Sequence, residues 1–256
     1  NANAAIGGLT TLSVTGTSSL NADVTSSSTQ VYTGNVTIDN DITLSTTNSQ
    51  ITFTGTVNSE ATEGNDLTIS VGTSEVEFDS AVGGSAALGE ISITGDLDLD
   101  ANITSATSLS VSADTNLAAD VTTSGTQTYG DDAASDATVT DGSRTLQGST
   151  VNFASTVTGT TAESDDLTIT GALNLDGAIT DINDLYVSGT SDIGANITTT
   201  GTQEYNNNVT LSGAARTLTT SGATVTFTGT VNGGQDLTVD TNGSDNLSSL
   251  ATVLFS

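Results

Sequence analysis

A segment that ends in Gln-x-Tyr occurs three times in this chain, at residues 20–32, 117–129 and 193–205. A second segment with a central Phe follows each copy, at residues 51–57, 151–157 and 225–231. Repetition on this scale is typical of stacked supersecondary units, in which each unit contacts only its neighbours. The sequence therefore favours a scaffold or an extended binding surface over a single catalytic pocket.

The spacing of the repeats indicates the size of one unit. The interval from Gln127 to Gln203 is shorter than that from Gln30 to Gln127, because the second long repeat lacks the equivalent of residues 71–91. A solenoid can lose one whole turn, whereas a closed sandwich cannot easily lose an internal segment. Residues 99–104 also resemble residues 117–122. From these offsets we expect turns of roughly 18–25 residues.

The local pattern predicts strands throughout. Apolar and polar residues alternate in segments such as 90–94, 96–100, 108–112 and 216–220, and a period of two is typical of strands with one buried face. Clusters of Gly, Asn, Asp and Ser separate these segments, as turns require. We predict an all-β fold without significant helices, a right-handed parallel β-helix. One continuous solenoid would cover residues 1–256, with long repeats at about 12–108, 109–184 and 185–256. The alternative is a series of immunoglobulin-like β-sandwiches.

The composition excludes several classes of function. The chain has a formal charge of −28, with Arg144 and Arg216 as its only basic residues, so binding to nucleic acids or to an anionic membrane is not expected. It contains no cysteine for disulfides and no apolar segment long enough to cross a membrane. The absence of proline fits strands that are paired on both edges.

Both ends of the sequence resemble the interior of a repeat. Residues 5–14 resemble residues 81–93, and residues 249–256 resemble the start of another turn. Neither end carries an obvious polar cap, and uncovered strand edges pair readily with other strands. We expect either a longer protein or end-to-end stacking of subunits. The residues predicted to mediate self-association are Leu9, Leu12, Val14, Leu250, Val253 and Phe255.

Recurring segments at 125–129, 166–170 and 225–233 resemble the repeats of large secreted bacterial exoproteins. These are the filamentous-haemagglutinin-like and related giant β-solenoid surface proteins, and the resemblance extends over almost the whole chain. It implies secretion, a parallel β-helical shaft, and a role in adhesion, aggregation or matrix formation. The amino-terminal secretion domain of that family is not recognisable in this chain.

The segment 96–100 suggests a calcium site. Asp96, Asp98 and Asp100 alternate with leucines, so they project from one strand face at intervals of about 6.5–7 Å. Carboxylates of an adjacent turn, for which Asp39 and Asp41 are candidates, would add oxygen ligands of the kind that Ca²⁺ prefers. The alternative is a solvated acidic strand without a metal.

Two further patterns admit both a functional and a structural interpretation. The Gln-x-Tyr pairs can form a sugar-binding surface, or the Gln side chains can stack in an amide ladder while the Tyr side chains fill a corner. Thr-x-Thr units are typical of the flat faces of ice-binding β-solenoids, but they also reflect ordinary β-propensity. In the best series Asn152 and Ala154 interrupt the pattern. The Thr-x-Thr units begin at Thr52, Thr138, Thr217 and Thr226.

The isolated arginines and asparagines give little further indication of function. Arg144 and Arg216 occupy equivalent positions before Thr-Leu, where an ion pair or hydrogen bonds to turn carbonyls are expected. Several Asn-x-Ser/Thr sequences are potential glycosylation sites, although a chain rich in Ser and Thr contains such matches by chance. They begin at Asn35, Asn102, Asn196, Asn208, Asn242 and Asn246.

The chain is not expected to be an enzyme. It has no His, Cys or Lys for acid–base or nucleophilic chemistry, although a carboxylate pair acting on a neutral glycan stays an alternative. The favoured function is a secreted structural fibre subunit or shaft segment that binds to itself end to end and supports adhesion or biofilm matrix formation. The alternative is a monomeric carbohydrate-binding or ice-binding adhesin module, with cell-surface glycans as partners.

Overall fold

The computed structural model describes residues 2–130, 135–140, 142–161, 164–241 and 253–255. These residues form an all-β parallel solenoid of about 11 turns, and they contain no helix. The chain divides into two compact units, residues 1–127 and 128–256, which are described separately below.

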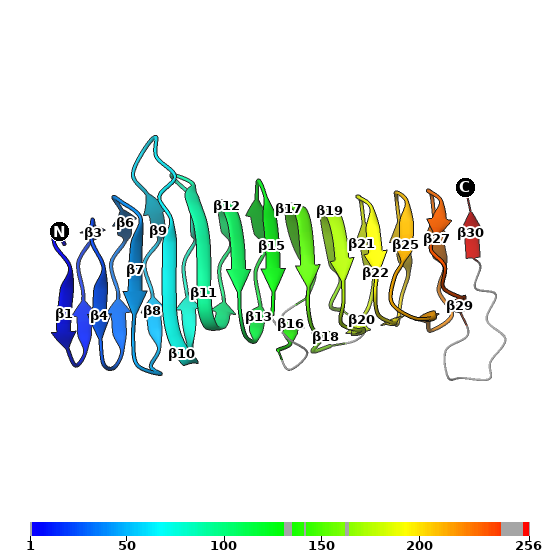
Figure 1. The fold of residues 1–256 in the computed structure, drawn as a ribbon, viewed down its shortest axis with the longest axis horizontal. Coiled ribbons are helices and arrows are strands. Elements are labelled where there is room, and N and C mark those ends of the chain that lie inside the picture. The colour runs from blue at the N-terminus through cyan, green and yellow to red at the C-terminus, as the bar shows by residue number, and fades with distance from the viewer. Residues whose placement is uncertain (1, 131–134, 141, 162–163, 242–252, 256) are drawn as a thin grey trace. The chain divides into compact units, whose positions relative to one another are not determined.

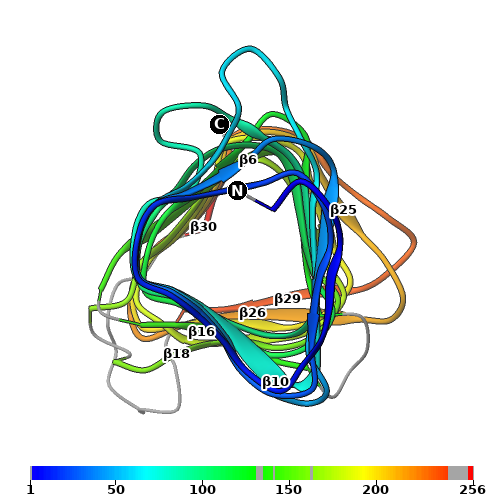
Figure 2. The same cartoon turned by 90° about the vertical axis from the view of Figure 1, so that its left-hand side faces the viewer.

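Each turn of unit 1 has three sides, and strands of successive turns lie beside one another on each side (Figure 2). The first side contains β1 (Ile6–Leu9), β4 (Val24–Ser26), β7 (Ile42–Ser45) and the first parts of β10 (Leu67–Phe78) and β11 (Leu88–Leu99), followed by the second part of β12 (Ile103–Val111). The second side contains β2 (Leu12–Val14), β5 (Gln30–Tyr32), β8 (Ile51–Phe53), the second parts of β10 and β11, and β13 (Thr115–Leu117). The third contains β3 (Ser18–Leu20), β6 (Val36–Ile38), β9 (Val57–Ser59), the start of β12 and β14 (Val121–Thr123).

Unit 2 is also a stack of successive turns (Figure 1), and its strands pair in parallel on three sides. One side contains β16 (Ala137–Val139), β18 (Val157–Gly159), β20 (Ile179–Ile182), β23 (Ile197–Thr199), β26 (Arg216–Thr220) and β29 (Leu237–Asp240). Another contains the first parts of β17 (Arg144–Phe153) and β19 (Leu167–Leu175), then β21 (Leu185–Val187), β24 (Gln203–Tyr205), β27 (Val225–Phe227) and β30 (Val253–Phe255). The third contains the second parts of β17 and β19, then β22 (Ser191–Ile193), β25 (Val209–Leu211) and β28 (Val231–Asn232). Strand β15 (Thr126–Tyr129) spans the boundary of the two units.

Parallel pairing confirms the solenoid and excludes the sandwich alternative for the strands above, because immunoglobulin-like sheets are antiparallel. The turn length also agrees with the sequence analysis. Val24 lies opposite Ile6 in one of the shortest turns, and Val76 lies opposite Ile51 in one of the longest. Both offsets fall within the predicted range of turn lengths, whereas Val253 lies opposite Val225 at an offset of 28 residues, which exceeds that range. Turns of unequal length therefore still pair in register.

The core consists of the inward residues of each strand. In β8, for example, Ile51 and Phe53 are fully buried while Thr52 between them faces outward. Aromatic side chains stack from turn to turn in unit 1: the ring centroids of Tyr32 and Phe53 are 5.1 Å apart, and those of Phe53 and Phe78 are also 5.1 Å apart. Aligned apolar columns of this kind stabilise each turn through its neighbours.

The Gln-x-Tyr repeat is out of step with the turns. In unit 2 the ring of Tyr129 stacks on Phe153, which lies opposite Leu175, whereas Tyr205 stacks on Phe227 on another side of the same unit. Equivalent residues of successive repeats therefore face different directions.

Candidate functional site

Two adjacent strands of unit 1 carry rows of carboxylates on their outer face. The first row consists of Glu75 and Glu77 on β10 with Asp79 just after it, and the second consists of Asp96 and Asp98 on β11 with Asp100 just after it. In the observed register Glu75 lies opposite Asp96 and Glu77 lies opposite Asp98. Like charges placed directly opposite one another on neighbouring strands repel and destabilise a sheet. We call these six residues the carboxylate rows.

One part of the carboxylate rows has a geometry suited to a cation. Oxygen atoms of Glu77, Asp79 and Asp100 all lie within 4.8 Å of one another. Of the three predicted ligands only Asp100 belongs to this group, and its partners there are Glu77 and Asp79 rather than Asp96 and Asp98. Asp39 and Asp41 lie elsewhere, between β6 and β7, where Ser19 donates to Asp39 and the amide of Asp66 donates to Asp41 at 2.9 Å.

Neutral donors border the carboxylate rows. On one side Gln50 Nε2 donates to Glu75 Oε1 at 2.8 Å and to Glu77 Oε2 at 3.0 Å. On the other side Asn116 Nδ2 donates to Asp98 Oδ1 at 2.8 Å. Both arginines of the chain belong to unit 2, so unit 1 contains no basic side chain to offset the negative charge.

The pKa values of two carboxyl groups reflect this environment. Partial burial raises the pKa of Glu77, the carboxylates of Asp79 and Asp98 raise it further, and the hydrogen bond from Thr52 acts in the opposite direction. Burial and the nearby Asp114 carboxylate raise the pKa of Asp96, against the hydrogen bond from the Asp114 amide. Ca²⁺ accepts oxygen ligands from carboxylates and water, so three carboxylates completed by water fit its chemistry. Calcium binding here stays a hypothesis.

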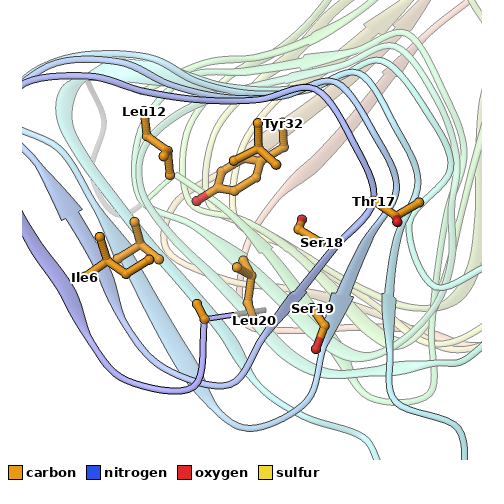
Figure 3. A pocket seen from close by; sticks show the side chains of 10 residues that line it. Ile6, Leu12, Thr17, Ser18, Ser19, Leu20 and Tyr32 are labelled. Atoms are coloured by element: carbon orange, nitrogen blue, oxygen red, sulfur yellow. The ribbon is translucent and has the colours of Figure 1, made fainter.

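The first turn of unit 1 contains a second candidate site, an apolar pocket of about 180 Å³. The side chains around it come from β1, β2, β3 and the turn that follows them (Figure 3). Leu12 and Val14, two of the predicted self-association residues, line it, whereas Leu9 is half-buried in β1. The pocket is lined by Ala2, Ile6, Leu12, Val14, Thr17, Ser18, Ser19, Leu20, Val24 and Tyr32.

The remaining predicted self-association residues belong to the carboxyl-terminal part of the sequence. Val253 and Phe255 lie in β30, where they pair with Val225 and Phe227 of β27. Leu250 lies outside the described residues. The structure therefore gives side-chain surroundings for Leu12 and Val14 in the pocket of the first turn, and only backbone pairing for Val253 and Phe255.

The Gln-x-Tyr pairs are structural where they can be followed. Gln30 is fully buried, and its Nε2 donates to the carbonyl oxygens of Val24 at 3.2 Å and Ser45 at 2.9 Å. The hydroxyl of Tyr32 donates to Gln30 Oε1 at 2.9 Å, and burial raises the pKa of Tyr32. The predicted amide ladder is wrong, because Gln30 lies between Leu12 and Ile51 rather than between other glutamines.

Side-chain oxygens of turn residues accept hydrogen bonds from the next turn. Asn35 Oδ1 accepts from the amide of Thr56 at 3.3 Å, and Asn208 Oδ1 accepts from the amide of Thr230 at 3.0 Å. Asn102 and Asn196 act in the same way, whereas Asn242 and Asn246 lie outside the described residues. The asparagines of four candidate glycosylation sequences thus connect successive turns.

Arg216 makes the expected hydrogen bonds to carbonyls. Its Nη2 donates to the carbonyl oxygen of Ser212 at 2.6 Å and its Nε donates to that of Ile193 at 3.3 Å. Arg144 Nη1 donates to the carbonyl oxygen of Ser143 at 2.8 Å. These contacts fit the structural role that the sequence suggested for both arginines.

Sequence reasoning missed the contribution of Glu77 and Asp79 to the carboxylate rows. The signal was present, since residues 75–79 alternate acidic and apolar residues just as residues 96–100 do. To predict that these two segments pair, one must know the length of the turn between them, and turn length varies along the chain.

No protein-family model matches this chain, and no curated protein or solved structure is detectably similar to it. Among the described residues no helix is long and apolar enough to span a membrane.

Proposed function

We propose that this chain is a shaft segment of a secreted structural fibre, which extends by adding turns to its ends and supports adhesion or matrix formation. The observation that carries this proposal is the construction of the first turn of unit 1. Its three strands pair with the following turn, and an apolar pocket opens beside them. Unpaired strand edges next to apolar side chains favour the addition of another turn.

Several other properties support the same function. The parallel solenoid agrees with the shaft that the resemblance to filamentous-haemagglutinin-like exoproteins implies. The charge of −28 opposes association through the outward faces of the turns, which leaves the strand edges of terminal turns for growth. The added turn belongs either to a second copy or to further residues of a longer chain. In this function the protein has no catalytic activity and acts outside the cell. Its partners in adhesion are cell-surface glycans.

A glycine stack makes the proposal testable. A Cβ atom added to Gly34 would collide with the backbone of Gly16, and one added to Gly55 would collide with the backbone of Gly34. A Cβ atom added to Gly16 meets nothing within 4 Å. If another turn covers the first turn with the same geometry, Gly16 becomes as crowded as Gly34.

Gly16→Ala is therefore expected to leave the monomer folded and to prevent filament formation, as judged by circular dichroism, light scattering and electron microscopy. The matched control is Gly64→Ala, because Gly64 lies in an exposed loop where an added Cβ atom makes only ordinary contacts. Leu12→Glu should act like Gly16→Ala, whereas Ser13→Glu adds the same charge to the outer face of β2 and should be harmless. Monomers at every concentration tested, or filaments that tolerate both Gly16→Ala and Leu12→Glu, would refute end-to-end addition by a second copy.

A further inference from the structure

One side of unit 2 carries a row of threonines that crosses five strands. The outward residue is Thr on each of β16, β18, β20, β23 and β26, and Figure 2 shows β16, β18 and β26 on the same side of the unit. The register aligns Thr138 with Thr158 and Thr158 with Thr180, and the hydroxyl oxygens of Thr158 and Thr180 are 3.4 Å apart. We call this side the threonine face. Its central row consists of Thr138, Thr158, Thr180, Thr198 and Thr219.

Further hydroxyl and amide groups flank the central row, most of them in the turns just before and after the strands. Some of these groups already bind within the protein, since the hydroxyl of Thr156 donates to Asp136 and that of Thr160 donates to Asp165 Oδ2 at 3.1 Å. The flanking residues are Thr156, Asn196 and Thr217 before the row and Thr140, Thr160, Thr200 and Ser221 after it. Adjacent strands are about 4.8 Å apart, and alternate residues of a strand are about 6.5–7 Å apart. The threonine face is therefore one regular row with less regular hydroxyl and amide groups beside it. It is interrupted at β20 by Ala178 and Asp181, where the register with β23 also shifts.

The central row is rigid. Threonine is branched at Cβ, which restricts its χ1 angle and holds its methyl and hydroxyl groups in place. The residue that precedes each central threonine on β18, β20, β23 and β26 is anchored in the core, since Val157, Ile179, Ile197 and Leu218 are fully buried. When water orders on rigid side chains, only the water molecules lose conformational freedom, because the side chains are already fixed. An ordered water layer therefore has a smaller entropic cost there than on mobile side chains.

The central row of the threonine face is itself uncharged, in a chain with a net charge of −28. Carboxylates lie around it: Asp136 accepts a hydrogen bond from Thr156, Asp240 lies opposite Thr219, and Asp181 interrupts β20. Carboxylates organise their own hydration shells, as the carboxylate rows of unit 1 must. An uncharged surface with regularly spaced groups is instead suited to binding an uncharged solid whose surface is also regular.

We propose that the threonine face binds ice. The hydroxyl groups of its central row repeat from strand to strand, as oxygen atoms repeat along one direction of an ice crystal plane. A crystalline polysaccharide fits less well, because the outward positions of β16, β18, β20, β23 and β26 carry no aromatic ring for stacking on sugars. Tyr129 and Tyr205 point into the core, and Tyr186 belongs to β21 on another side. This activity is independent of fibre formation.

The experiment is ice-affinity partitioning of the complete chain, together with measurement of the gap between melting and freezing temperatures. Thr198 is exposed, whereas the other four threonines of the central row are half-buried. Thr198→Tyr keeps good β-propensity, and its ring would project beyond the row. The matched control is Thr210→Tyr on β25, because Thr210 is also exposed but lies on another side of unit 2.

The wild-type chain and Thr210→Tyr should be enriched in growing ice, and the temperature gap of Thr198→Tyr should be smaller than that of the wild-type chain by at least about ten-fold. Circular dichroism establishes that both variants are folded. The proposal is overturned if the wild-type chain is excluded from ice, if it binds insoluble polysaccharide but not ice, or if both variants lose the activity equally.

Discussion

At the scale of single residues, buried polar side chains join one turn to the next. Gln203 is fully buried; its Nε2 donates to Thr219 O at 2.9 Å and to Thr199 Oγ1 at 3.2 Å, and its Oε1 accepts from Tyr205 Oη at 3.1 Å. The sequence singled out this pair by repetition, but it did not show which carbonyl the amide reaches. That contact depends on the length of the following turn, which differs between the copies.

Replacing Gln203 with Leu should lower the free energy of unfolding by about 1–3 kcal/mol, because it leaves Tyr205 Oη and the Thr219 carbonyl buried without their partner. Glu204→Gln, on the outer face of the same strand, should change it by less than about 0.5 kcal/mol. Urea denaturation followed by circular dichroism measures both. Equal effects would show that the buried amide contributes nothing specific.

At the scale of strands, turn length decides which side chains become neighbours. Alternation in the sequence predicted the strands and their inward residues, and the shortened second repeat predicted that whole turns can be lost. The pairing of residues 75–79 with residues 96–100 was not predictable, since short and long turns follow one another in no simple order. For the same reason the threonine face was not predictable from the sequence, because its members are separated by unequal intervals.

The carboxylate rows should make the protein more stable at mildly acidic pH. The pKa values of Glu77 and Asp96 are raised in the folded state, so the folded chain binds more protons than the unfolded chain as these groups titrate. Their stabilising contribution is therefore present at low pH and is lost as the pH rises through the folded pKa values. Both groups are largely hydrated, so the expected effect is small, about 0.5 kcal/mol.

The measurement is thermal unfolding at neutral pH and near pH 4.5, the ordinary pKa of glutamate. The combined variant Glu77→Gln and Asp96→Asn should gain less from acidification than the wild-type chain. Glu204→Gln in unit 2 serves as the control and should keep the full response. A wild-type response no larger than that of the combined variant would contradict this assignment.

Calcium should stabilise unit 1 through Glu77, Asp79 and Asp100. For an affinity in the range of extracellular calcium modules, about 0.1–1 mM, 10 mM Ca²⁺ would add about 1.4–2.7 kcal/mol. The increase in melting temperature should be reversed by a chelator and lost when Asp79→Asn is combined with Asp100→Asn. Asp176→Asn, an exposed change in unit 2, should retain it. A rise that persists in the double variant would reflect general screening of charge.

At the scale of the molecule, turns that stack in register account for most of what is distinctive about the chain. They explain how a sequence without proline or cysteine and with few aromatic residues can form a continuous apolar core in each unit. They also explain why repeats in the sequence face different directions in space. The carboxylate rows, the glycine stack and the threonine face all arise because residues one turn apart become direct neighbours.

The most direct test of this stacking is disulfide mapping, which is clean because the chain has no native cysteine. Thr168 lies opposite Tyr186, and Tyr186 lies opposite Glu204, in three successive turns of unit 2. Adjacent turns place Cα atoms about 4.8 Å apart, within reach of a disulfide, whereas two turns place them about 9.6 Å apart, beyond it.

Cysteine pairs at 168 and 186 and at 186 and 204 should therefore form intramolecular disulfides on mild oxidation, and the pair at 168 and 204 should not. Cross-linking in all three pairs, or only in the pair at 168 and 204, would contradict the stacked parallel turns on which this account depends.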